Sequence, residues 1–157
     1  SYQVHQQMSA CIVTGCSAGN GLAIARQLLA DGHHVIGIDR KAPETDLLEW
    51  VFLGDVLDKN LCDSVFDKAL SLADGELYLI NNAGVTYGEY PQDDMVWDST
   101  LNVNLKAPYQ WSRKFSEHVI KKNVREGGIV FIGSLATTMG FPRNPAYQAS
   151  KAGLTSS

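Results

Sequence analysis

A cluster of glycines near the start of the chain constrains its fold more than any other feature. The apolar run 10–14 ends directly in the segment Gly15–Gly21, whose spacing is G-x-x-x-G-x-G, and residues 22–29 then show helical periodicity. This order predicts a β-strand, a tight turn and an α-helix. Glycine lets such a turn approach a pyrophosphate closely, and free N–H groups at the helix N-terminus attract its charge. A glycine-rich turn also occurs where it only closes a strand–helix corner, so the motif alone leaves both interpretations open.

Further apolar stretches continue the alternation of strand and helix along the chain. Strands are predicted at residues 34–38, 51–53, 77–80 and 129–132. Helical segments are predicted around 44–49, over 61–72, over a long stretch 94–122 that is closed by Glu126-Gly127-Gly128, and over 147–154. The strands show little polar alternation, which is typical of parallel strands buried on both faces. With right-handed crossovers, the pattern predicts an α/β fold: a doubly wound parallel sheet of Rossmann type with five strands.

Polar turns follow the other predicted strands. Asp39 ends the second strand, where a carboxylate can accept hydrogen bonds from an adenosine ribose; a solvated strand end is the alternative. Asp55-Val56 follows the third strand and Asn82-Ala83-Gly84 the fourth. In an open α/β sheet, ligands bind beyond the carboxyl ends of the strands, so these turns and the glycine turn are expected to converge on one crevice. The candidate cofactor-binding residues of the crevice are Gly15, Ser17, Asn20, Gly21, Asp39, Arg40, Asp55, Val56, Asn82, Ala83 and Gly84.

Two side chains near the end of the chain form a candidate catalytic pair. Tyr147 and Lys151 have i, i+4 spacing and therefore share one face of the predicted helix. A purely structural pairing is the alternative at this spacing. Ser134 follows the fifth predicted strand and adds a hydroxyl at the same edge of the sheet.

Taken together, these residues resemble the short-chain dehydrogenase/reductase family. The resemblance covers the chain after its first residues, and it is carried by Thr14-Gly15-x-x-x-Gly19-x-Gly21, Asn81-Asn82-Ala83-Gly84, Asn104, Ser134 and Tyr147-x-x-x-Lys151. It implies Tyr147 as the general acid/base, with Lys151 activating it and binding the cofactor ribose. It also implies that Ser134 holds the carbonyl oxygen of the substrate and that Asn104 completes a catalytic tetrad. Family members usually run further, through two last strands and a substrate-covering segment, and we expect this chain to lack them.

The implied roles are chemically consistent. A secondary alcohol that loses a hydride to nicotinamide must also lose a proton, and a phenol with an ordinary pKa of ~10 is a poor base at pH 7. Lowering such a pKa to about 7 requires about 4 kcal/mol of differential stabilisation. A neighbouring ammonium, the positive charge of the oxidised nicotinamide and a helix N-terminus all act in that direction. A serine hydroxyl can donate to the developing alkoxide. The sequence offers no His/Cys/Asp cluster with metal-ligand spacing, and this chemistry needs no metal.

Length and composition predict a single globular domain. The 157 residues are 45% hydrophobic and 19% charged. Residues 1–8 are polar and aperiodic, so we expect a disordered tail or a remnant of cloning, followed by one dinucleotide-binding domain over residues 9–157. The helix predicted over 147–154 leads into nothing further, and the domain is therefore expected to be incomplete at its C-terminus.

Charge and cysteine content exclude other classes of protein. The 13 Lys and Arg are outnumbered by 17 Asp and Glu, and a net charge of −4 is not the basic footprint of a nucleic-acid-binding domain. No apolar run approaches the ~20 residues that cross a bilayer, so we expect no membrane association. Three cysteines without metal-ligand spacing argue against a disulfide framework and favour a reducing, cytoplasmic location.

The sequence thus predicts an oxidoreductase that interconverts a carbonyl and a secondary alcohol by hydride transfer with a nicotinamide cofactor. A non-catalytic dinucleotide-binding subunit with a regulatory or assembly role is the alternative, although a pure binder has no need of the tetrad. A third reading is an inert fragment of the fold. The small-molecule substrate stays open, because the segment 135–146 mixes apolar and polar residues and permits a sugar, a steroid or an acyl thioester.

The predicted cofactor is NAD rather than NADP. The carboxylate of Asp39 would hold the ribose hydroxyls and repel a 2′-phosphate. Arg40 and Lys41, which follow directly, are the counterargument, because a guanidinium can fold over such a phosphate.

The long helical segment carries two further expectations. The resemblance implies a homodimer or homotetramer that pairs through this helix and the helix beginning at Tyr147. Trp111 and Phe115 of the long helix could face a partner; burial against the sheet is the alternative. Pro108 has no N–H for the carbonyl of Asn104, so we expect that carbonyl to be free and the helix to bend. The resemblance also implies that Asn104 holds a water that links Lys151 to solvent.

Overall fold

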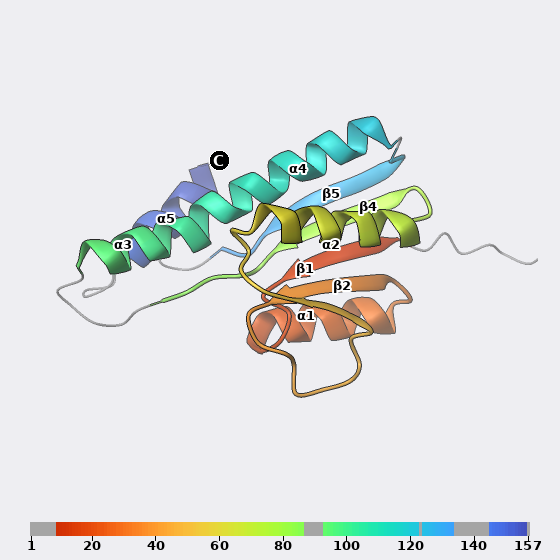
Figure 1. The fold of residues 1–157 in the computed structure, drawn as a ribbon, viewed down its shortest axis with the longest axis horizontal. Coiled ribbons are helices and arrows are strands. Elements are labelled where there is room, and N and C mark those ends of the chain that lie inside the picture. Colours follow the sequence, from red (N-terminus) through yellow and green to blue (C-terminus); the bar gives the residue numbers. More distant parts are fainter. Residues whose placement is uncertain (1–8, 87–92, 123, 134–144, 157) are drawn as a thin grey trace, which may run out of the picture.

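A parallel sheet with helices on both faces forms the framework of the protein in a computed structural model (Figure 1). The structure describes residues 9–86, 93–122, 124–133 and 145–156. The sheet has five strands in the order β3-β2-β1-β4-β5, and every neighbouring pair is parallel. The strands are β1 (Ala10–Thr14), β2 (His34–Asp39), β3 (Trp50–Leu53), β4 (Glu76–Asn81) and β5 (Glu126–Phe131). The predicted doubly wound α/β fold is confirmed.

The helices lie on both sides of this sheet. They are α1 (Gly19–Ala30), α2 (Lys59–Leu72), α3 (Asp94–Leu101), the π-helical η1 (Asn102–Lys106), α4 (Ala107–Lys121) and α5 (Pro145–Ser156). In Figure 1, α1 covers one face and α2 and α4 cover the other, while α5 packs along α3 and η1. The chain runs outward from β1 to β3 in one direction and from β4 to β5 in the other. The strand order therefore reverses between β1 and β4, which is where such sheets bind ligands.

Alternating side chains of the strands build a core on each face of the sheet. Ile12 packs in the cluster beneath α2 and α4, together with Phe66 and Trp111. The next residue of the strand, Val13, packs in the cluster beneath α1, together with Ala25. Because both faces are covered, the inner strands read as continuous apolar runs, which is why they were predictable.

Trp111 and Phe115 of α4 belong to this core. Trp111 is 1% exposed and Phe115 is 6% exposed, so neither faces a partner. The Trp111 Nε1–H donates to the Val56 carbonyl oxygen at 2.8 Å and thereby fixes the loop after β3. The interpretation of these two side chains as interface residues is wrong, because the sheet face needs large apolar groups to fill the space under α4.

One predicted helix and the start of one strand differ from the structure. The segment 44–49 contains no helix: it follows Pro43, and the Thr45 hydroxyl accepts a hydrogen bond from the Leu47 N–H at 3.3 Å, which favours turns. Strand β5 begins at Glu126, so Gly127 and its neighbour glycine lie inside the strand and do not precede it. A side chain on Gly127 would overlap the carbonyl oxygen of Leu77 on β4, so close pairing of the strands requires glycine there.

The segment predicted as one long helix is interrupted by η1. The Ala107 N–H donates to the carbonyl oxygen of Asn102, five residues earlier, as in a π-helix. Pro108 falls in the first turn of α4, where a missing N–H costs little. The irregularity expected near Pro108 thus takes the form of a wide π-helical turn, and the free carbonyl of Asn104 stays a prediction.

Candidate active site

Side chains join the glycine turn to the turn after β4. The Thr14 hydroxyl oxygen accepts hydrogen bonds from the Asn82 N–H at 3.0 Å and the Ala83 N–H at 2.9 Å. In return, Asn82 Nδ2 donates to the Gly15 carbonyl oxygen at 3.1 Å. Thr14, which is 3% exposed, is absent from the predicted site residues, although it begins the glycine motif. The two turns therefore form one connected surface at the reversal of strand order.

Glycine is required at two points of this surface. Gly15 has a φ of 68°, and a side chain there would approach the Ala83 backbone to 2.9 Å. A side chain on Gly21 would overlap the Gly15 carbonyl oxygen, so the first turn of α1 can pack this closely only with glycine. The N-cap of α1 is Ala18, whose methyl group cannot cap the helix N–H groups. The N–H groups of the first turn of α1 are therefore left without a side-chain cap, and such N–H groups attract phosphate groups.

Asp39 organises the outer side of the glycine turn. Its Oδ2 accepts a hydrogen bond from the Ser17 N–H at 3.0 Å, and its Oδ1 accepts one from the Lys41 N–H at 3.3 Å. The Ser17 hydroxyl donates to the Lys41 carbonyl oxygen at 2.6 Å. These contacts hold the carboxylate at the end of β2, beside the glycine turn, where a ribose could reach it.

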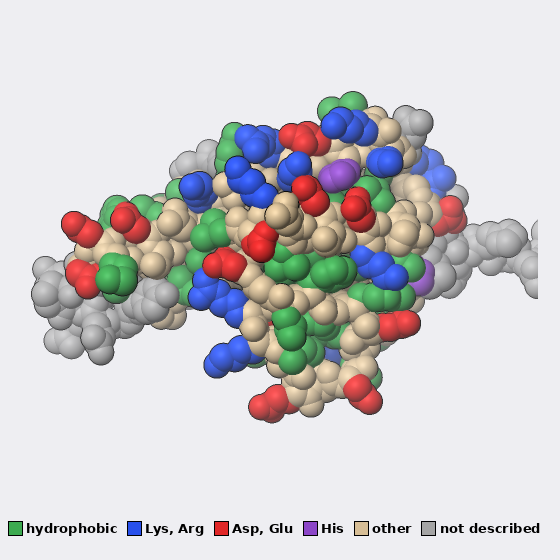
Figure 2. Space-filling view, viewed as in Figure 1, with side chains coloured by type: hydrophobic (Ala, Val, Ile, Leu, Met, Phe, Trp, Pro, Cys, Tyr) green, Lys and Arg blue, Asp and Glu red, His purple; other side chains and the backbone are tan. Residues whose placement is uncertain are grey.

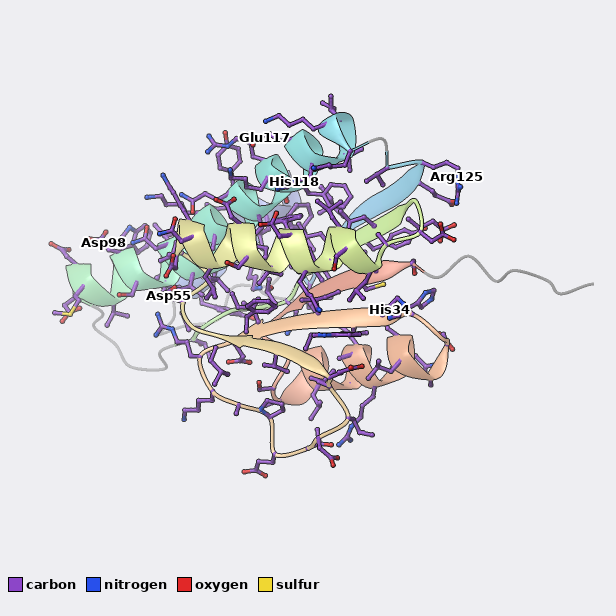
Figure 3. The ribbon with its side chains drawn as sticks, turned by 45° about the vertical axis from the view of Figure 1, so that its right-hand side comes forward. His34, Asp55, Asp98, Glu117, His118 and Arg125 are labelled. Carbon is purple, nitrogen blue, oxygen red and sulfur yellow. The ribbon has the colours of Figure 1, made fainter. Side chains whose placement is uncertain are left out.

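An ion pair connects the ends of β2 and β3. Arg40 Nη2 lies 2.9 Å from Asp55 Oδ2, and Asp55 Oδ1 also accepts a hydrogen bond from the Leu57 N–H at 2.9 Å. Asp55 is labelled in Figure 3, on the loop that leads into α2. The two side chains are 62% and 43% exposed, so the pair contributes only about 0–1 kcal/mol to stability. Its larger consequence is local, because it engages the guanidinium next to Asp39.

These turns enclose a cavity of about 300 Å³. It is lined by Gly15, Ala18, Asp39, Arg40, Gly54, Val56, Asn82, Ala83, Gly84, Val85 and Val103. Most of the predicted cofactor-binding residues thus meet in one place. Asn20 is exposed and lies in the first turn of α1, outside this lining. Asp55 is also outside it, but its carboxylate pairs with Arg40, which is part of the lining.

The amide of Asn104 lies behind this cavity, and it is completely buried. Its Oδ1 accepts a hydrogen bond from the Val85 N–H at 2.7 Å, and its Nδ2 donates to the Val85 carbonyl oxygen at 2.8 Å. The same Nδ2 also donates to the Ser150 hydroxyl at 3.2 Å. The side chain from η1 therefore ties the turn after β4 to helix α5. Val85 is not predictable from the sequence, because these bonds use its backbone.

Lys151 and Tyr147 occupy neighbouring turns of α5. The Lys151 Nζ lies 5.9 Å from the centre of the Tyr147 ring and donates to the Ile132 carbonyl oxygen at 3.2 Å. Lys151 is 6% exposed, and this burial lowers its pKa below the usual 10.5. A methyl group on Gly84 would lie 3.7 Å from the Nζ and 3.3 Å from the Asn104 Oδ1, so the ammonium borders the turn that lines the cavity. Ser134 lies outside the described residues, as do residues 1–8.

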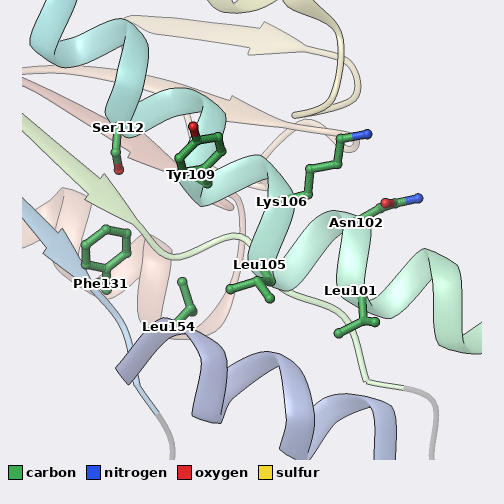
Figure 4. Close-up of a pocket in the computed structure, with 8 residues that line it drawn as sticks. All are labelled: Leu101, Asn102, Leu105, Lys106, Tyr109, Ser112, Phe131 and Leu154. Carbon is green, nitrogen blue, oxygen red and sulfur yellow. The ribbon is translucent and has the colours of Figure 1, made fainter. Parts of the chain in front are cut away.

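A second cavity, of about 510 Å³, is almost entirely apolar and contains none of the predicted site residues (Figure 4). It lies between α4, β5 and α5 and is lined by Leu101, Asn102, Leu105, Lys106, Tyr109, Ser112, Phe131 and Leu154. In Figure 4, Tyr109, Phe131 and Leu154 project into the space between these elements. Tyr109 is 62% exposed and Phe131 is 38% exposed.

The molecular surface is mixed in charge. Figure 2 shows acidic and basic side chains interspersed over the face that α2 and α4 cover. Among the described residues, none of the helices has the length and apolar character to traverse a bilayer. Burial raises the pKa of Cys11 to about 11 and that of Cys62 to about 12, so both stay protonated thiols at neutral pH.

Comparisons with known proteins agree with this architecture. A family model for short chain dehydrogenases matches residues 9–156. The short chain dehydrogenase/reductase dpchG of Colletotrichum higginsianum is 36% identical over 157 aligned residues, which cover 92% of this chain and 59% of the relative. The 3-oxoacyl-[acyl-carrier-protein] reductase FabG of Escherichia coli is 34% identical, with 91% of this chain and 62% of the relative covered.

Solved structures give the same result. A 4-hydroxyisoleucine dehydrogenase complexed with NADH superposes with a TM-score of 0.79 at 27% identity, covering 94% of this chain and 65% of that one. The aldohexose dehydrogenase of Thermoplasma acidophilum has a TM-score of 0.83 at 25% identity, with 96% of this chain and 58% of that one covered. The chain spans about three fifths of the length of the curated relatives that it matches. Since the family model accounts for residues 9–156, the chain belongs to the short-chain dehydrogenase/reductase family.

Proposed function

We propose that the protein interconverts a carbonyl and a secondary alcohol with a nicotinamide cofactor, and that Tyr147 is the general acid/base. The observation that carries this proposal is the position of the Lys151 ammonium. It is buried, lies 5.9 Å from the Tyr147 ring centre, and borders the Gly84 turn that lines the first cavity. A purely structural lysine gains little from such a place, because burial disfavours its charge.

The residues of the first cavity fit a dinucleotide. The glycine turn and the N-terminus of α1 would hold the pyrophosphate, Asp39 the adenosine ribose, and Lys151 the nicotinamide ribose. When bound, the cofactor accepts or supplies the hydride. The NADH complex of the 4-hydroxyisoleucine dehydrogenase supports this class of cofactor, since that protein shares the fold.

The chain itself would handle the proton. The Lys151 ammonium favours the ionised form of the neighbouring phenol, which can then take a proton from the alcohol. In the reverse direction the phenol returns that proton to the developing alkoxide. Ser134 would donate a hydrogen bond to the same oxygen, as the family resemblance implies. Asn104 holds the Val85 turn beside Lys151 and so keeps the pair next to the cavity.

A direct test combines binding with turnover. Dinucleotide affinity is measured by calorimetry, and reduction of NAD is followed with a panel of secondary alcohols that includes sugars, steroids and 3-hydroxyacyl thioesters. Turnover with one class supports the proposal and identifies the substrate. Tight dinucleotide binding without turnover across the panel would favour the non-catalytic subunit, and absence of binding would contradict both functions.

We expect NAD to give a higher kcat/KM than NADP, because Asp39 repels a 2′-phosphate and Asp55 already engages Arg40. In Asp55→Asn, the amide oxygen can still accept from the Leu57 N–H, but the charge that holds Arg40 is lost. The kcat/KM ratio of NADP to NAD should then rise by about tenfold, equivalent to about 1.4 kcal/mol.

The matched control for this charge change is Asp63→Asn, which breaks the ion pair with Lys114 on the α2–α4 surface. It should leave the cofactor ratio unchanged. A wild-type protein that prefers NADP would overturn the assignment, and an equal response of both variants would show that only net charge matters.

We also expect a homodimer or homotetramer, and the exposed apolar side chains around the second cavity support this expectation. Tyr109→Glu places a charge at this surface and should shift the mass measured by light scattering toward the monomer. Leu47→Glu is the control, because Leu47 is 56% exposed but lies in the segment between β2 and β3. A wild-type monomer at micromolar concentration would count against the expectation.

A further inference from the structure

We propose that Ser150 is a positioning residue for Tyr147, because its hydroxyl joins the first turn of α5 to the Asn104 amide. The inference rests on the proposed function of Tyr147. Ser150 is completely buried, one residue before Lys151. Its Oγ donates to the Tyr147 carbonyl oxygen at 2.8 Å and accepts a hydrogen bond from Asn104 Nδ2 at 3.2 Å. The hydroxyl is therefore used as both donor and acceptor.

The other side of this link is rigidly oriented. The Val85 N–H can only donate and the Val85 carbonyl can only accept, so the Asn104 amide has one orientation that satisfies both, at 2.7 and 2.8 Å. In that orientation the second Nδ2 hydrogen is directed to Ser150. Val85 follows the turn that lines the cofactor cavity. The side chains of Asn104 and Ser150 thus connect the first turn of α5 to the cavity wall.

Directional bonds matter here because the apolar contact that the described residues make between α5 and η1 has little directionality. Gly153 lies against the Leu105 side chain, where a methyl group would approach to 2.9 Å. Apolar packing of this kind holds the two helices together, but it does not define their relative rotation. The Ser150 link and the bond from Lys151 to the Ile132 carbonyl do define it. Removing the hydroxyl takes away the bond that ties α5 to the Asn104 amide and leaves the bond from Lys151 to the Ile132 carbonyl in place.

A merely structural role would predict a different behaviour. Serine hydroxyls in helices often bond to the carbonyl three or four residues earlier, with little effect elsewhere. Ser71 makes this bond on α2, from its Oγ to the Lys68 carbonyl at 2.6 Å, and it is exposed. Ser150 makes the same bond and adds the one to Asn104. Ser71→Ala is consequently a matched control, because it removes the hydrogen bond to the carbonyl three residues earlier that both serines make.

The experiment compares Ser150→Ala with Ser71→Ala and the wild type. We expect kcat of Ser150→Ala to fall by about tenfold or more, since small misplacements of reacting groups are costly, while KM for NAD stays within about twofold. The pH at which kcat is half-maximal should also move, because the Tyr147–Lys151 geometry changes. Ser71→Ala should change none of these values. A Ser150→Ala protein with wild-type kcat and pH profile would overturn the inference.

Two further measurements separate the possible failures. Backbone hydrogen exchange of residues 146–151 should be faster in Ser150→Ala than in the wild type, and this result needs no turnover. Unchanged exchange there would show the inference to be wrong. If Ser150→Ala loses NAD affinity in proportion to kcat, the residue is structural only, and positioning is again excluded. Absence of turnover in the wild type counts against the proposed function instead, and the exchange measurement then decides the role of Ser150 by itself.

Discussion

Tyr147→Phe is expected to abolish turnover while leaving dinucleotide affinity nearly unchanged. The substitution removes only the oxygen that would transfer the proton, and it keeps the ring beside the Lys151 Nζ. Loss of a general acid/base lowers kcat by about 10²–10⁴-fold. The measurement is steady-state kcat with the best alcohol of the panel, together with calorimetric affinity for NAD.

The control for this substitution is Tyr109→Phe, which removes a phenol oxygen from a tyrosine that is 62% exposed on α4. Its kcat should equal that of the wild type. If Tyr147→Phe keeps even about a tenth of the wild-type rate, far more than loss of a general acid/base allows, the proton goes elsewhere and the proposed mechanism is wrong.

The second large effect is expected for Lys151→Met, which should damage both turnover and NAD affinity. Methionine keeps the length of the side chain but removes the charge that favours ionisation of Tyr147 and the donor for the nicotinamide ribose. Lys114→Met is the control, because Lys114 forms ion pairs with Asp63 and Glu117 on the surface. Kinetics should therefore separate the two lysines clearly. If Lys151→Met kept full NAD affinity, the proposal that Lys151 binds the nicotinamide ribose would be wrong.

The same lysine predicts how activity and stability depend on pH. Burial lowers the pKa of Lys151 below 10.5, so activity that needs the ammonium should disappear at a lower pH than for an exposed lysine. The effect of pH on stability is opposite in sign to that of a lysine whose pKa is raised by an ion pair. Below the folded-state pKa the buried ammonium lowers the free energy of unfolding, and this penalty is relieved as pH rises through that pKa toward 10.5. Denaturant titrations should thus find Lys151→Met no less stable than the wild type at neutral pH.

Much of the fold was predictable because most of the strands are buried on both faces. The runs at β1, β2 and β4 stand out as apolar stretches, and their ends carry the turns that line the cavity. Gly127-Gly128 favours a turn on sequence grounds because glycine pairs usually mark turns, whereas in the structure the close approach of β4 requires the first of them inside β5. The π-helical turn at η1 was also missed, because five residues are too few to change a helical period.

The site was only partly predictable for a related reason. Residues such as Asp39 and Asn82 could be assigned because their positions at strand ends already bring them together. Thr14, Val85 and Ser150 act through hydrogen bonds to residues far away in the sequence, at separations of 68, 19 and 46 positions. Neither the spacing nor the type of these residues predicts such a bond, so these contacts can be found only in the structure.

The π-helical turn at η1 has a consequence for redesign of this chain. Deleting one residue from Asn102–Lys106 would return this turn to α-helical spacing, although Pro108 would still lack an N–H, and it would rotate α3 by about 100° about the helix axis. Thr100, now completely buried, would turn toward solvent, and Met95, now 74% exposed, would turn with it to a new face. Local helical regularity and tertiary fit therefore conflict at this point. A design procedure that rewards ideal helices would remove the residue, and with it the register that aims the Asn104 amide at Ser150.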